Sequence, residues 1–396
     1  MSDTPVVAIN GPRQSGKTTL VKTIVTSEWR YLTLDDQTVL EAANSNPVGF
    51  VRDLDKAVID EIQRAPALML ALKQSIDADR RPGRFLITGS ANVLTMPAAQ
   101  ESLAGRIEVA TLLPLSQAEL ARATHPAFLV ALFEGEPPRH VERGATGDVL
   151  IGKVLAGGYP EVLSRDNEGR RLAWCRQYLD AIVQRDLADI ASVEKPVQAR
   201  RLIDALAIQI GQLTNFSDLG GKLGLSSHTV ATYLNLLEQL FIVRRLEAWH
   251  RNALKRLIKT PKLHFRDTGL VAASRRLTLA RVKADRTAFG PLLEGFVFAE
   301  LEKLATVAED PIAFSHYRDK DQVEVDFVLE NGSGAVVGVE VKASATVTAA
   351  DFAGLRKLAT AAGEDFRIGV VLYDGDETLP FGDRLWAAPI SSLWAS

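Results

Sequence analysis

A glycine-bearing loop near the start of the chain constrains its fold more than any other feature. Val6 to Ile9 form a short apolar run, and a helical segment begins near Lys17. Between them, residues 11 to 18 read Gly-Pro-Arg-Gln-Ser-Gly-Lys-Thr, which matches G-x-x-x-x-G-K-[ST] in the strand, loop and helix context that this pattern requires. Backbone N–H groups of such a loop, with the N-terminus of the helix, bind phosphate groups. The motif therefore predicts a nucleotide-binding α/β layer.

The residues of this loop have expected roles. Lys17 reaches the β and γ oxygens of a nucleoside triphosphate, and the Thr18 hydroxyl ligates Mg²⁺. The predicted nucleotide contacts are Gly11, Pro12, Arg13, Gln14, Ser15, Gly16, Lys17, Thr18 and Thr19.

Polar residues end the next two apolar runs. The run Val58-Ile59 is followed by Asp60 and Glu61, which places Asp60 near the magnesium ion and Glu61 near the attacking water. A solvated strand end or a helix-capping pair is the alternative interpretation. A further run ends in Thr88-Gly89-Ser90, where Ser90 either senses the γ-phosphate or only caps the strand. Because these runs alternate with helical stretches as far as about Leu120, we expect a parallel sheet covered by helices.

Several motifs together resemble the AAA-type ATPases that carry a domain of unknown function at the C-terminus. The resemblance rests on the loop, Ile59-Asp-Glu-Ile-Gln63, Ile87 to Ser90, Ser102 to Arg106, Gly157-Gly-Tyr-Pro160, Arg185-Asp186 and Arg318 to Asp326. It implies that ATP and magnesium are bound, that Arg106 is an arginine finger in a neighbour's site, and that Tyr159 and Pro160 form a lid element near the adenine. An active oligomer, as a ring, follows from the finger role. For Arg106, a surface salt bridge is the alternative.

Residues 216 to 265 have the size and spacing of a winged helix. Two helices, Phe216 to Leu223 and Ser227 to Gln239, flank a turn at residues 224–226, and Phe241 to Ala248 with Lys262 to Phe265 form the strands of a wing. Between residues 244 and 286 lie thirteen basic residues and three acidic ones, although the whole chain has a net charge of -3. Such charge suits phosphate contacts without sequence discrimination. The predicted DNA contacts are His228, Thr229, Thr232, Arg244, Arg245, Arg251, Lys255, Arg256 and Lys259. A protein-binding spacer is the alternative.

A second group of acidic residues lies near the C-terminus. If residues 332–334 make a three-residue hairpin loop, Asp326 falls opposite Glu340. Asp326 followed by Glu340-Val-Lys342, with Glu294 on the preceding helix, resembles the PD-(D/E)xK nuclease superfamily. That resemblance implies that Asp326 and Glu340 bind Mg²⁺, that Lys342 orients or activates the attacking water, and that Glu294 assists. A scaffold that binds DNA or a partner without cutting is the alternative.

Length and composition fit a packed protein of several domains. The 396 residues are 46% hydrophobic and 24% charged, and the single cysteine, Cys175, can form neither an internal disulfide nor a thiolate metal site alone. No run approaches the ~18 to 20 apolar residues that span a bilayer, and residues 1–5 lead into the loop without a signal peptide, so we expect a cytoplasmic protein with no membrane segment. The predicted domains are an ATPase core (1–125), a helical lid (126–200), a winged helix (201–286) and a nuclease-like α/β domain (287–396).

These features lead to three hypotheses about function. The first is an ATP-hydrolysing DNA motor or remodeller of the AAA type. The second is a Mg²⁺-dependent DNA endonuclease that ATP hydrolysis licenses. The third is a nucleotide-dependent switch that binds a protein partner.

Overall fold

The computed structural model describes residues 2–90, 105–123, 127–139, 144–187, 196–252, 256 and 260–395. The chain divides into two compact units, which are described separately. The first comprises Met1–Pro114 and Gln239–Ile242, and the second comprises Leu115–Glu238 and Val243–Ser396.

The first unit is built on a five-stranded parallel sheet with the strand order β2-β3-β4-β1-β5. Its strands are β1 (Val6–Asn10), β2 (Arg30–Thr33), β3 (Ala57–Asp60), β4 (Phe85–Gly89) and β5 (Ile107–Thr111). The parallel pairing confirms the predicted α/β layer. Because β1 carries the glycine-bearing loop and β3 carries the acidic pair, the carboxyl edge of this sheet gathers the predicted nucleotide residues.

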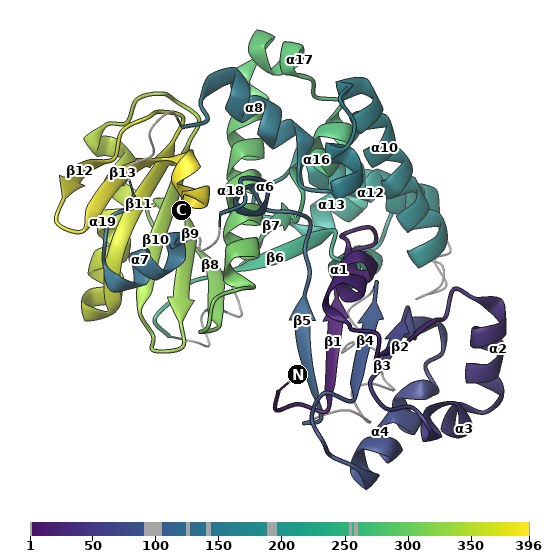
Figure 1. The fold of residues 1–396 in the computed structure, drawn as a ribbon. Helices are drawn as coiled ribbons and strands as arrows, with labels where there is room; N and C mark the ends of the chain where they lie inside the picture. The colour runs from purple at the N-terminus through teal and green to yellow at the C-terminus, as the bar shows by residue number, and fades with distance from the viewer. Residues whose placement is uncertain are drawn as a thin grey trace. The chain divides into compact units, whose positions relative to one another are not determined.

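Helices cover this sheet on both faces (Figure 1). On one face, Val6, Ala8 and Ile59 lie in a core cluster with Leu68 and Leu72 of α4 (Leu68–Ala78). On the other face, Ile9 and Val58 pack with Val21 of α1 (Lys17–Ile24). Residues of β1 and β3 therefore alternate between two buried faces, which explains the apolar runs Val6 to Ile9 and Ala57 to Ile59. The remaining helices are α2 (Gln37–Ser45) and α3 (Pro47–Arg52).

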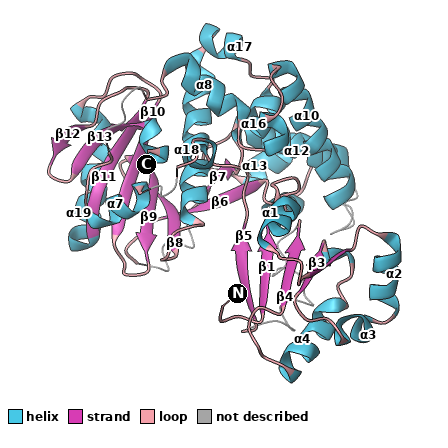
Figure 2. Ribbon diagram, in the orientation of Figure 1, coloured by secondary structure: helices cyan, strands magenta, loops and turns pink. Residues whose placement is uncertain are grey.

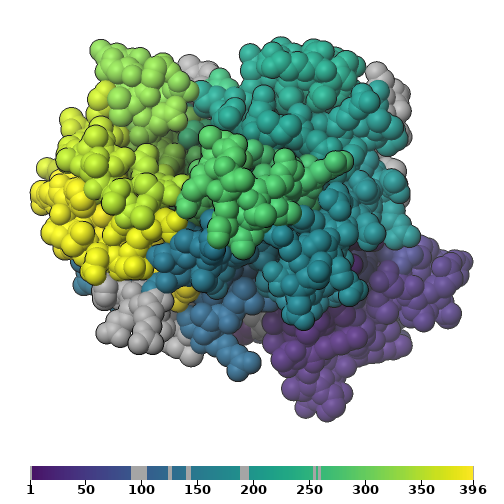
Figure 3. All heavy atoms as spheres, turned by 90° about the horizontal axis from the view of Figure 1, so that it is seen from above, coloured from purple at the N-terminus to yellow at the C-terminus, as the bar shows by residue number. Residues whose placement is uncertain are grey.

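The second unit begins with helices. They are α6 (Gln117–Leu120), α7 (Phe128–Glu134), α8 (Gly147–Ala156), α9 (Pro160–Leu163), α10 (Glu168–Ala181), a π-helical turn (Ile182–Asp186), α12 (Pro196–Ile208), α16 (Thr268–Arg275) and α17 (Leu279–Ala284). Buried α16 packs against α8, α10 and α12. In the space-filling view, the green segment that includes α17 lies between teal helical residues and yellow C-terminal residues (Figure 3). The described residues between 126 and 200 are helical where they form regular structure, as the predicted helical lid requires.

The predicted helices and hairpin of the middle region are present at the expected positions. They are α13 (Phe216–Leu223), α14 (Ser227–Gln239), β6 (Val243–Ala248) and β7 (Lys262–Phe265), with β6 and β7 antiparallel. Ser226 Oγ accepts a hydrogen bond from the Thr229 N–H at 3.0 Å and so caps α14. Val230 and Leu234 are fully buried, as the helical spacing predicts.

The C-terminal part is a mixed sheet flanked by helices (Figure 2). Its elements are α18 (Phe289–Ala305), β8 (Ile312–Arg318), β9 (Glu324–Asn331), β10 (Val336–Lys342), α19 (Ala353–Ala362), β11 (Phe366–Tyr373), β12 (Leu379–Gly382) and β13 (Leu385–Pro389). The register pairs Phe327 with Val339, which places Asp326 opposite Glu340, as predicted. Asn331 N–H donates to the Ala335 carbonyl at 3.2 Å, so three residues form the hairpin loop.

The β6–β7 hairpin extends this sheet, which the sequence analysis did not anticipate. Glu247 and Ala248 of β6 pair in parallel with Ser315 and His316 of β8, giving the order β12-β13-β11-β10-β9-β8-β6-β7. The wing predicted for one domain is therefore hydrogen-bonded to the sheet predicted for the next.

A buried ion pair on α18 holds the point at which the chain enters the second unit. Glu300 and Lys303 are 2% and 7% exposed, and Lys303 Nζ lies 2.8 Å from Glu300 Oε1. Glu300 also accepts from the Gln117 N–H at 2.6 Å, and Lys303 donates to the Leu115 carbonyl at 3.1 Å. The residues that follow β5 are therefore anchored to α18.

We predict that Glu300→Ala lowers the free energy of unfolding by about 3–5 kcal/mol, because it leaves the Lys303 ammonium buried without its carboxylate. Urea denaturation followed by circular dichroism measures the loss. Lys283→Ala is the matched control, since it breaks an ion pair with Asp148 that is about half exposed and should cost less than about 1 kcal/mol. Equal and small effects of the two substitutions would contradict the anchoring role.

Candidate functional site

The glycine-bearing loop adopts a backbone that depends on its glycines. Gly11 and Gly16 have φ angles of 148° and 104°. A Cβ atom on Gly11 would lie 2.1 Å from the Leu112 carbonyl oxygen, so a side chain there would displace the residue that follows β5. Helix α1 begins directly after Gly16 without a side-chain cap. Its first N–H groups therefore remain available for an anion.

Lys17 folds back onto the loop. Its Nζ donates to the carbonyls of Gly11 at 3.0 Å and Pro12 at 2.8 Å, and the residue is 5% exposed. Burial lowers the pKa of Lys17 to about 8, although the carboxylates of Glu61 and Asp60 oppose the shift. A bound triphosphate would offer this ammonium stronger partners than two carbonyls.

The loop residues fit a phosphate group and a magnesium ion. Ser15 Oγ is buried and has no hydrogen-bond partner among the described atoms, so a phosphate oxygen would satisfy it. Thr18 Oγ1 donates to Asp60 Oδ2 at 3.1 Å. This hydroxyl and carboxylate are oxygen ligands of the kind that Mg²⁺ prefers. The structure therefore brings together the predicted Thr18 and Asp60.

Asp60 is the centre of the polar contacts at the end of β3. It is 4% exposed and accepts hydrogen bonds from the hydroxyls of Thr18, Tyr31 and Thr88. Burial raises the pKa of Tyr31, and the hydrogen bond and charge of Asp60 raise it further. Tyr31 was not predicted as a site residue, because a tyrosine in a neighbouring strand carries no motif of its own.

Glu61 is held by a neighbouring amide. The backbone of Glu61 is left-handed, with a φ of 61°, and its N–H donates to Thr88 Oγ1 at 3.2 Å. Gln63 Nε2 donates to the Glu61 carboxylate and, at 3.0 Å, to Ser90 Oγ. The predicted base and the predicted sensor are therefore joined through Gln63, which the sequence analysis quoted only within a motif.

Arg106 is engaged in an ion pair within the chain. Its Nε and NH2 groups donate to the two carboxylate oxygens of Asp77 at 2.8 and 3.2 Å. Strands β1 and β5 are parallel neighbours. Arg106 comes just before β5 and the glycine-bearing loop comes just after β1, so the two lie at opposite edges of the sheet. The finger role stays a prediction, and residues 91–104 lie outside the described part of the chain.

The Gly-Gly-Tyr-Pro motif packs inside the second unit. Gly158 N–H donates to Asp267 Oδ2 at 2.7 Å, and a Cβ atom on Gly157 would lie 2.3 Å from Asp267 Oδ1. Tyr159 is 1% exposed, and its ring lies 5.0 Å from that of Tyr178. Close approach to the Asp267 carboxylate explains Gly157, whereas a Cβ atom on Gly158 would lie 2.2 Å from the Leu115 carbonyl oxygen. The adenine contacts of Tyr159 and Pro160 stay predictions.

Several residues predicted to contact DNA phosphates are paired with acidic residues. Arg244 binds Glu302, Arg245 binds Glu238, and Arg256 binds Glu330 at 2.9 Å. His228, Thr232 and Arg251 are exposed, and Thr229 is half-buried. Lys255 and Lys259 lie outside the described residues. The positive charge of this segment is therefore balanced in part by ion pairs that its composition does not reveal.

The predicted carboxylate constellation is assembled, and it contains a lysine that was not predicted. Asp326 N–H donates to Glu340 Oε2 at 3.3 Å, and Lys342 Nζ lies 2.8 Å from Glu340 Oε1. Lys262 of β7 is 3% exposed, and its Nζ lies 3.4 Å from Glu294, 3.3 Å from Glu324 and 3.5 Å from Asp326. We call Lys262 and the four acidic residues the carboxylate cluster.

The cluster concentrates charge in a buried place. Burial raises the pKa of Glu294 well above its usual range and that of Glu340 to about 8, with Asp326 adding to both shifts. Burial alone would lower the pKa of Lys262, but Glu294, Asp326 and Glu324 outweigh it and raise that pKa. The neighbouring carboxylates therefore favour the charged form of Lys262. In the described part of the chain, no three His, Cys, Asp or Glu side chains are arranged to hold a metal ion.

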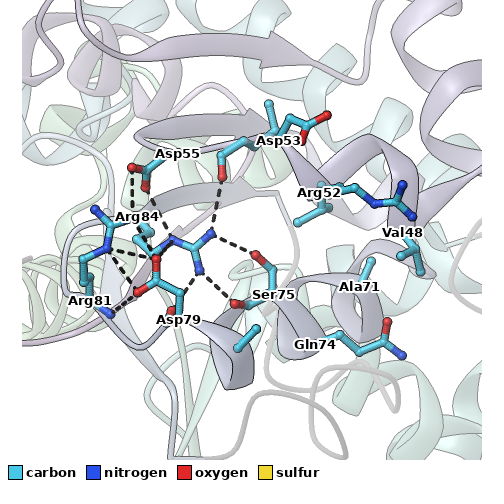
Figure 4. A pocket seen from close by; sticks show the side chains of 13 residues that line it. Val48, Arg52, Asp53, Asp55, Ala71, Gln74, Ser75, Asp79, Arg81 and Arg84 are labelled. Atoms are coloured by element: carbon cyan, nitrogen blue, oxygen red, sulfur yellow. Dashed lines mark hydrogen bonds and ion pairs between the residues drawn. The ribbon is translucent and has the colours of Figure 1, made fainter.

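A cavity of about 510 Å³ is lined by residues that belong neither to the glycine-bearing loop nor to the carboxylate cluster (Figure 4). It lies where the chain enters β3 and β4, at the edge of the sheet opposite to the glycine-bearing loop. Arg84 lines it with its guanidinium donating to the Ser75 and Asp79 carbonyls at 2.9 and 2.8 Å. Arg81 and Asp79 pair beside it. Arg81 and Arg84 also pair with Asp55 at this cavity.

Three segments match known families. Residues 3–121 match the AAA domain family, which supports an AAA-type ATPase in this part of the chain. Residues 149–281 and 289–393 match two domains of unknown function, DUF8612 and DUF4143. In the described residues no helix is long and apolar enough to cross a membrane.

Similar proteins are known in bacteria. Uncharacterized proteins of Mycobacterium bovis and Mycobacterium tuberculosis are each 29% identical over 98% of this chain and 81% of their own length. An uncharacterized protein of Haemophilus influenzae is 29% identical over 62% of this chain and 56% of its own length. A solved structure, the DNA clamp loader delta protein of Bacillus subtilis, covers 60% of this chain and 84% of its own with 12% identity and a TM-score of 0.24, a likeness too weak to carry an argument.

We predict that triphosphate affinity falls as the pH rises through about 8, the pKa of Lys17 in the free protein. Triphosphate binding favours the charged ammonium form of Lys17. Affinity is therefore constant below pH 8, and above pH 8 it declines by up to about tenfold per pH unit, because the neutral amine of Lys17 must take up a proton on binding. Titration with a fluorescent triphosphate analogue between pH 7 and 9.5 measures this. Lys22→Ala, an exposed lysine on the same helix, should keep the wild-type profile, and a flat wild-type profile would contradict the prediction.

Proposed function

We propose that this protein is an AAA-type ATPase that hydrolyses ATP at the loop of residues 11–18. The single observation that carries the proposal is the geometry at Asp60, whose carboxylate accepts the Thr18 hydroxyl at 3.1 Å next to a buried Lys17. The buried, unpartnered Ser15 hydroxyl supports a phosphate ligand in the same loop. The match of residues 3–121 to the AAA domain family is independent support.

Each residue of this site has a role in the reaction. Lys17 exchanges its loop carbonyls for phosphate oxygens, and Ser15 and the first N–H groups of α1 bind the same charge. Thr18 and Asp60 would hold Mg²⁺, which supplies charge neutralisation of the phosphates. Glu61 accepts a proton from the attacking water as general base, and Gln63 positions the Glu61 carboxylate. Ser90 lies at the other end of the same amide and senses the γ-phosphate.

The position of Arg106 favours action on a neighbouring subunit. The five residues of β5 span about 17 Å, and Arg106 lies at the amino end of this span. The glycine-bearing loop lies at the carboxyl end of the adjacent strand β1. An arginine side chain cannot cover that distance, so a finger role requires a second subunit. The distance between Arg106 and the loop of its own subunit therefore supports a ring-shaped homo-oligomer.

The chain segment from Leu112 to Leu115 connects the nucleotide-binding loop with the second unit. Gly11 is packed against Leu112, and Leu112 N–H donates to the Asn10 carbonyl at 2.8 Å. Three residues later, Leu115 is bound by Lys303 and by the Gly158 carbonyl. A change in the loop therefore acts on a short segment whose other end is anchored to α18. We propose that this segment transmits hydrolysis to the second unit.

We propose DNA as the macromolecule on which the second unit acts. The exposed polar side chains at the start of α14, His228 and Thr232, support this assignment. Because Arg244, Arg245 and Arg256 already bind carboxylates, contacts would be few and sequence-independent. The same pairing favours a second candidate, a nucleotide switch that binds a protein partner. Cleavage of DNA at the carboxylate cluster is the remaining proposal.

We predict that Glu61→Gln lowers the rate of ATP hydrolysis about 100-fold or more while retaining nucleotide binding, because only the general base is lost. Phosphate release measures the rate, and a fluorescent analogue measures binding. Glu41→Gln, an exposed substitution on α2, should keep the wild-type rate. Hydrolysis by Glu61→Gln at the wild-type rate would remove Glu61 from the reaction.

The same assay separates the candidate partners. Duplex and single-stranded DNA should raise the hydrolysis rate, and the effect should weaken between 50 and 200 mM salt because phosphate contacts release counterions. If no form of DNA alters the rate at either salt concentration, the DNA assignment falls and the protein-partner switch is favoured, whereas the ATPase assignment depends only on the basal rate.

We predict that Arg106→Ala and Glu61→Gln each inactivate the protein and that mixing them restores part of the activity. In a mixed oligomer, an Arg106→Ala subunit keeps its own Glu61 and receives Arg106 from a Glu61→Gln neighbour. An arginine finger raises the hydrolysis rate by about 10³–10⁵-fold. Arg80→Ala is the matched control, since Arg80 also pairs with Asp77 but is largely exposed, and it should remain active. No recovery on mixing would contradict action between subunits.

A further inference from the structure

Lys262 holds the position between the carboxylates that a divalent cation would need. Its Nζ lies 3.3 to 3.5 Å from oxygens of Glu294, Glu324 and Asp326, which come from α18 and β9. Mg²⁺ requires oxygen ligands at about 2.1 Å in near-octahedral geometry. An ion bound to these oxygens would overlap the ammonium, so the residues as arranged do not fit a metal.

The remaining contacts of the cluster are also made within the chain. The second oxygen of Asp326 accepts from the Val341 N–H at 3.0 Å, and the Glu340 carboxylate is bound by Lys342 and by the Asp326 N–H. Glu324 is bound by Arg318 at 3.1 Å as well as by Lys262. The acidic side chains that the nuclease resemblance assigns to metal are therefore satisfied by cations and N–H groups of the protein.

Lys262 lies on the β6–β7 hairpin, at the end of the sheet whose strands β9 and β10 carry Glu324, Asp326 and Glu340. It is the first residue of β7 and bridges to Leu213, in the segment that precedes α13. In that segment Gly211 N–H donates to the Leu263 carbonyl at 3.0 Å, and a Cβ atom on Gly211 would lie 3.0 Å from the Glu294 carboxylate. Strand β6 of the hairpin pairs with β8 at Glu247–Ser315 and Ala248–His316, and the next N–H, that of Trp249, donates to the His316 carbonyl at 2.6 Å. One lysine therefore links the helix-turn-helix region to the carboxylate cluster.

We propose that Lys262 is a built-in counter-cation that locks the hairpin onto the carboxylate cluster and excludes divalent metal from it. While the ammonium is in place, the cluster is a structural ion-pair site. Withdrawal of β7 would remove the ammonium and leave Glu294, Glu324, Asp326 and Glu340 to bind a divalent cation. A divalent metal ion could therefore bind to the carboxylate cluster only after the β6–β7 hairpin has moved away. The inference does not depend on ATP hydrolysis, since it concerns a different set of residues.

Binding of Mn²⁺ in the absence of nucleotide tests the proposal. All proteins carry Thr18→Ala, so that the loop of residues 11–18 does not contribute a metal ligand. Lys262→Met keeps the length of the side chain but removes its charge, and we expect it to bind one Mn²⁺ at least about tenfold more tightly than the protein with Lys262, measured by calorimetry or by the electron paramagnetic resonance of free Mn²⁺. Adding Asp326→Asn to Lys262→Met should abolish the gain. Lys222→Met, an exposed lysine on α13 paired with Asp218, is the control and should bind as the parent does.

Thermal unfolding is a second measurement, which can be made even if Lys262→Met is unstable without metal. Without metal, Lys262→Met should unfold at a lower temperature than its parent because its carboxylates lose their counter-cation, and Mn²⁺ should raise its unfolding temperature but not that of the parent. If Lys262→Met unfolds as it is purified, refolding with Mn²⁺ should restore the cooperative transition. The proposal is overturned if the parent binds Mn²⁺ as tightly as Lys262→Met, or if Mn²⁺ neither binds nor stabilises Lys262→Met.

Discussion

The buried carboxylate of Asp60 is the constraint on which the nucleotide site depends. It ends β3 at the carboxyl edge of a parallel sheet and accepts hydrogen bonds from hydroxyls on α1, β2 and β4. A buried carboxylate is costly unless it is hydrogen-bonded, and three hydroxyl groups satisfy that requirement here. The requirement to satisfy Asp60 therefore fixes the relative positions of Thr18, Tyr31 and Thr88. The site is preorganised by the same contacts that stabilise the end of the sheet.

Local patterns were sufficient where the chemistry is local. The loop motif predicted the strand, the turn and the helix, because glycines with positive φ and a helix beginning at Lys17 follow from the sequence itself. Alternation of apolar residues and a short loop predicted that Asp326 faces Glu340. In each case the relevant contacts lie within one element or between neighbours in the chain.

Contacts between distant elements were not predictable in the same way. Tyr31 reaches Asp60 across 29 positions, and Lys262 reaches Glu324 from a hairpin that was expected to belong to a separate domain. The basic segment illustrates the physical reason, since composition counts charges but not their partners. Arg244 pairs with Glu302, 58 positions away, so the charge available to a phosphate is smaller than the sequence suggests. Ion pairs between residues far apart in the sequence therefore determine which residues form the carboxylate cluster and how much positive charge the second unit exposes.

The most direct test of the central claim is a structure of the protein with a non-hydrolysable ATP analogue and Mg²⁺. We expect the analogue in the loop of residues 11–18, with Lys17 Nζ moved from the carbonyls of Gly11 and Pro12 to the β and γ phosphates. Ser15 should donate to a phosphate oxygen, and Thr18 and Asp60 should surround the metal ion. An analogue bound elsewhere, or a loop in which Lys17 keeps both carbonyls at saturating analogue, would contradict the account.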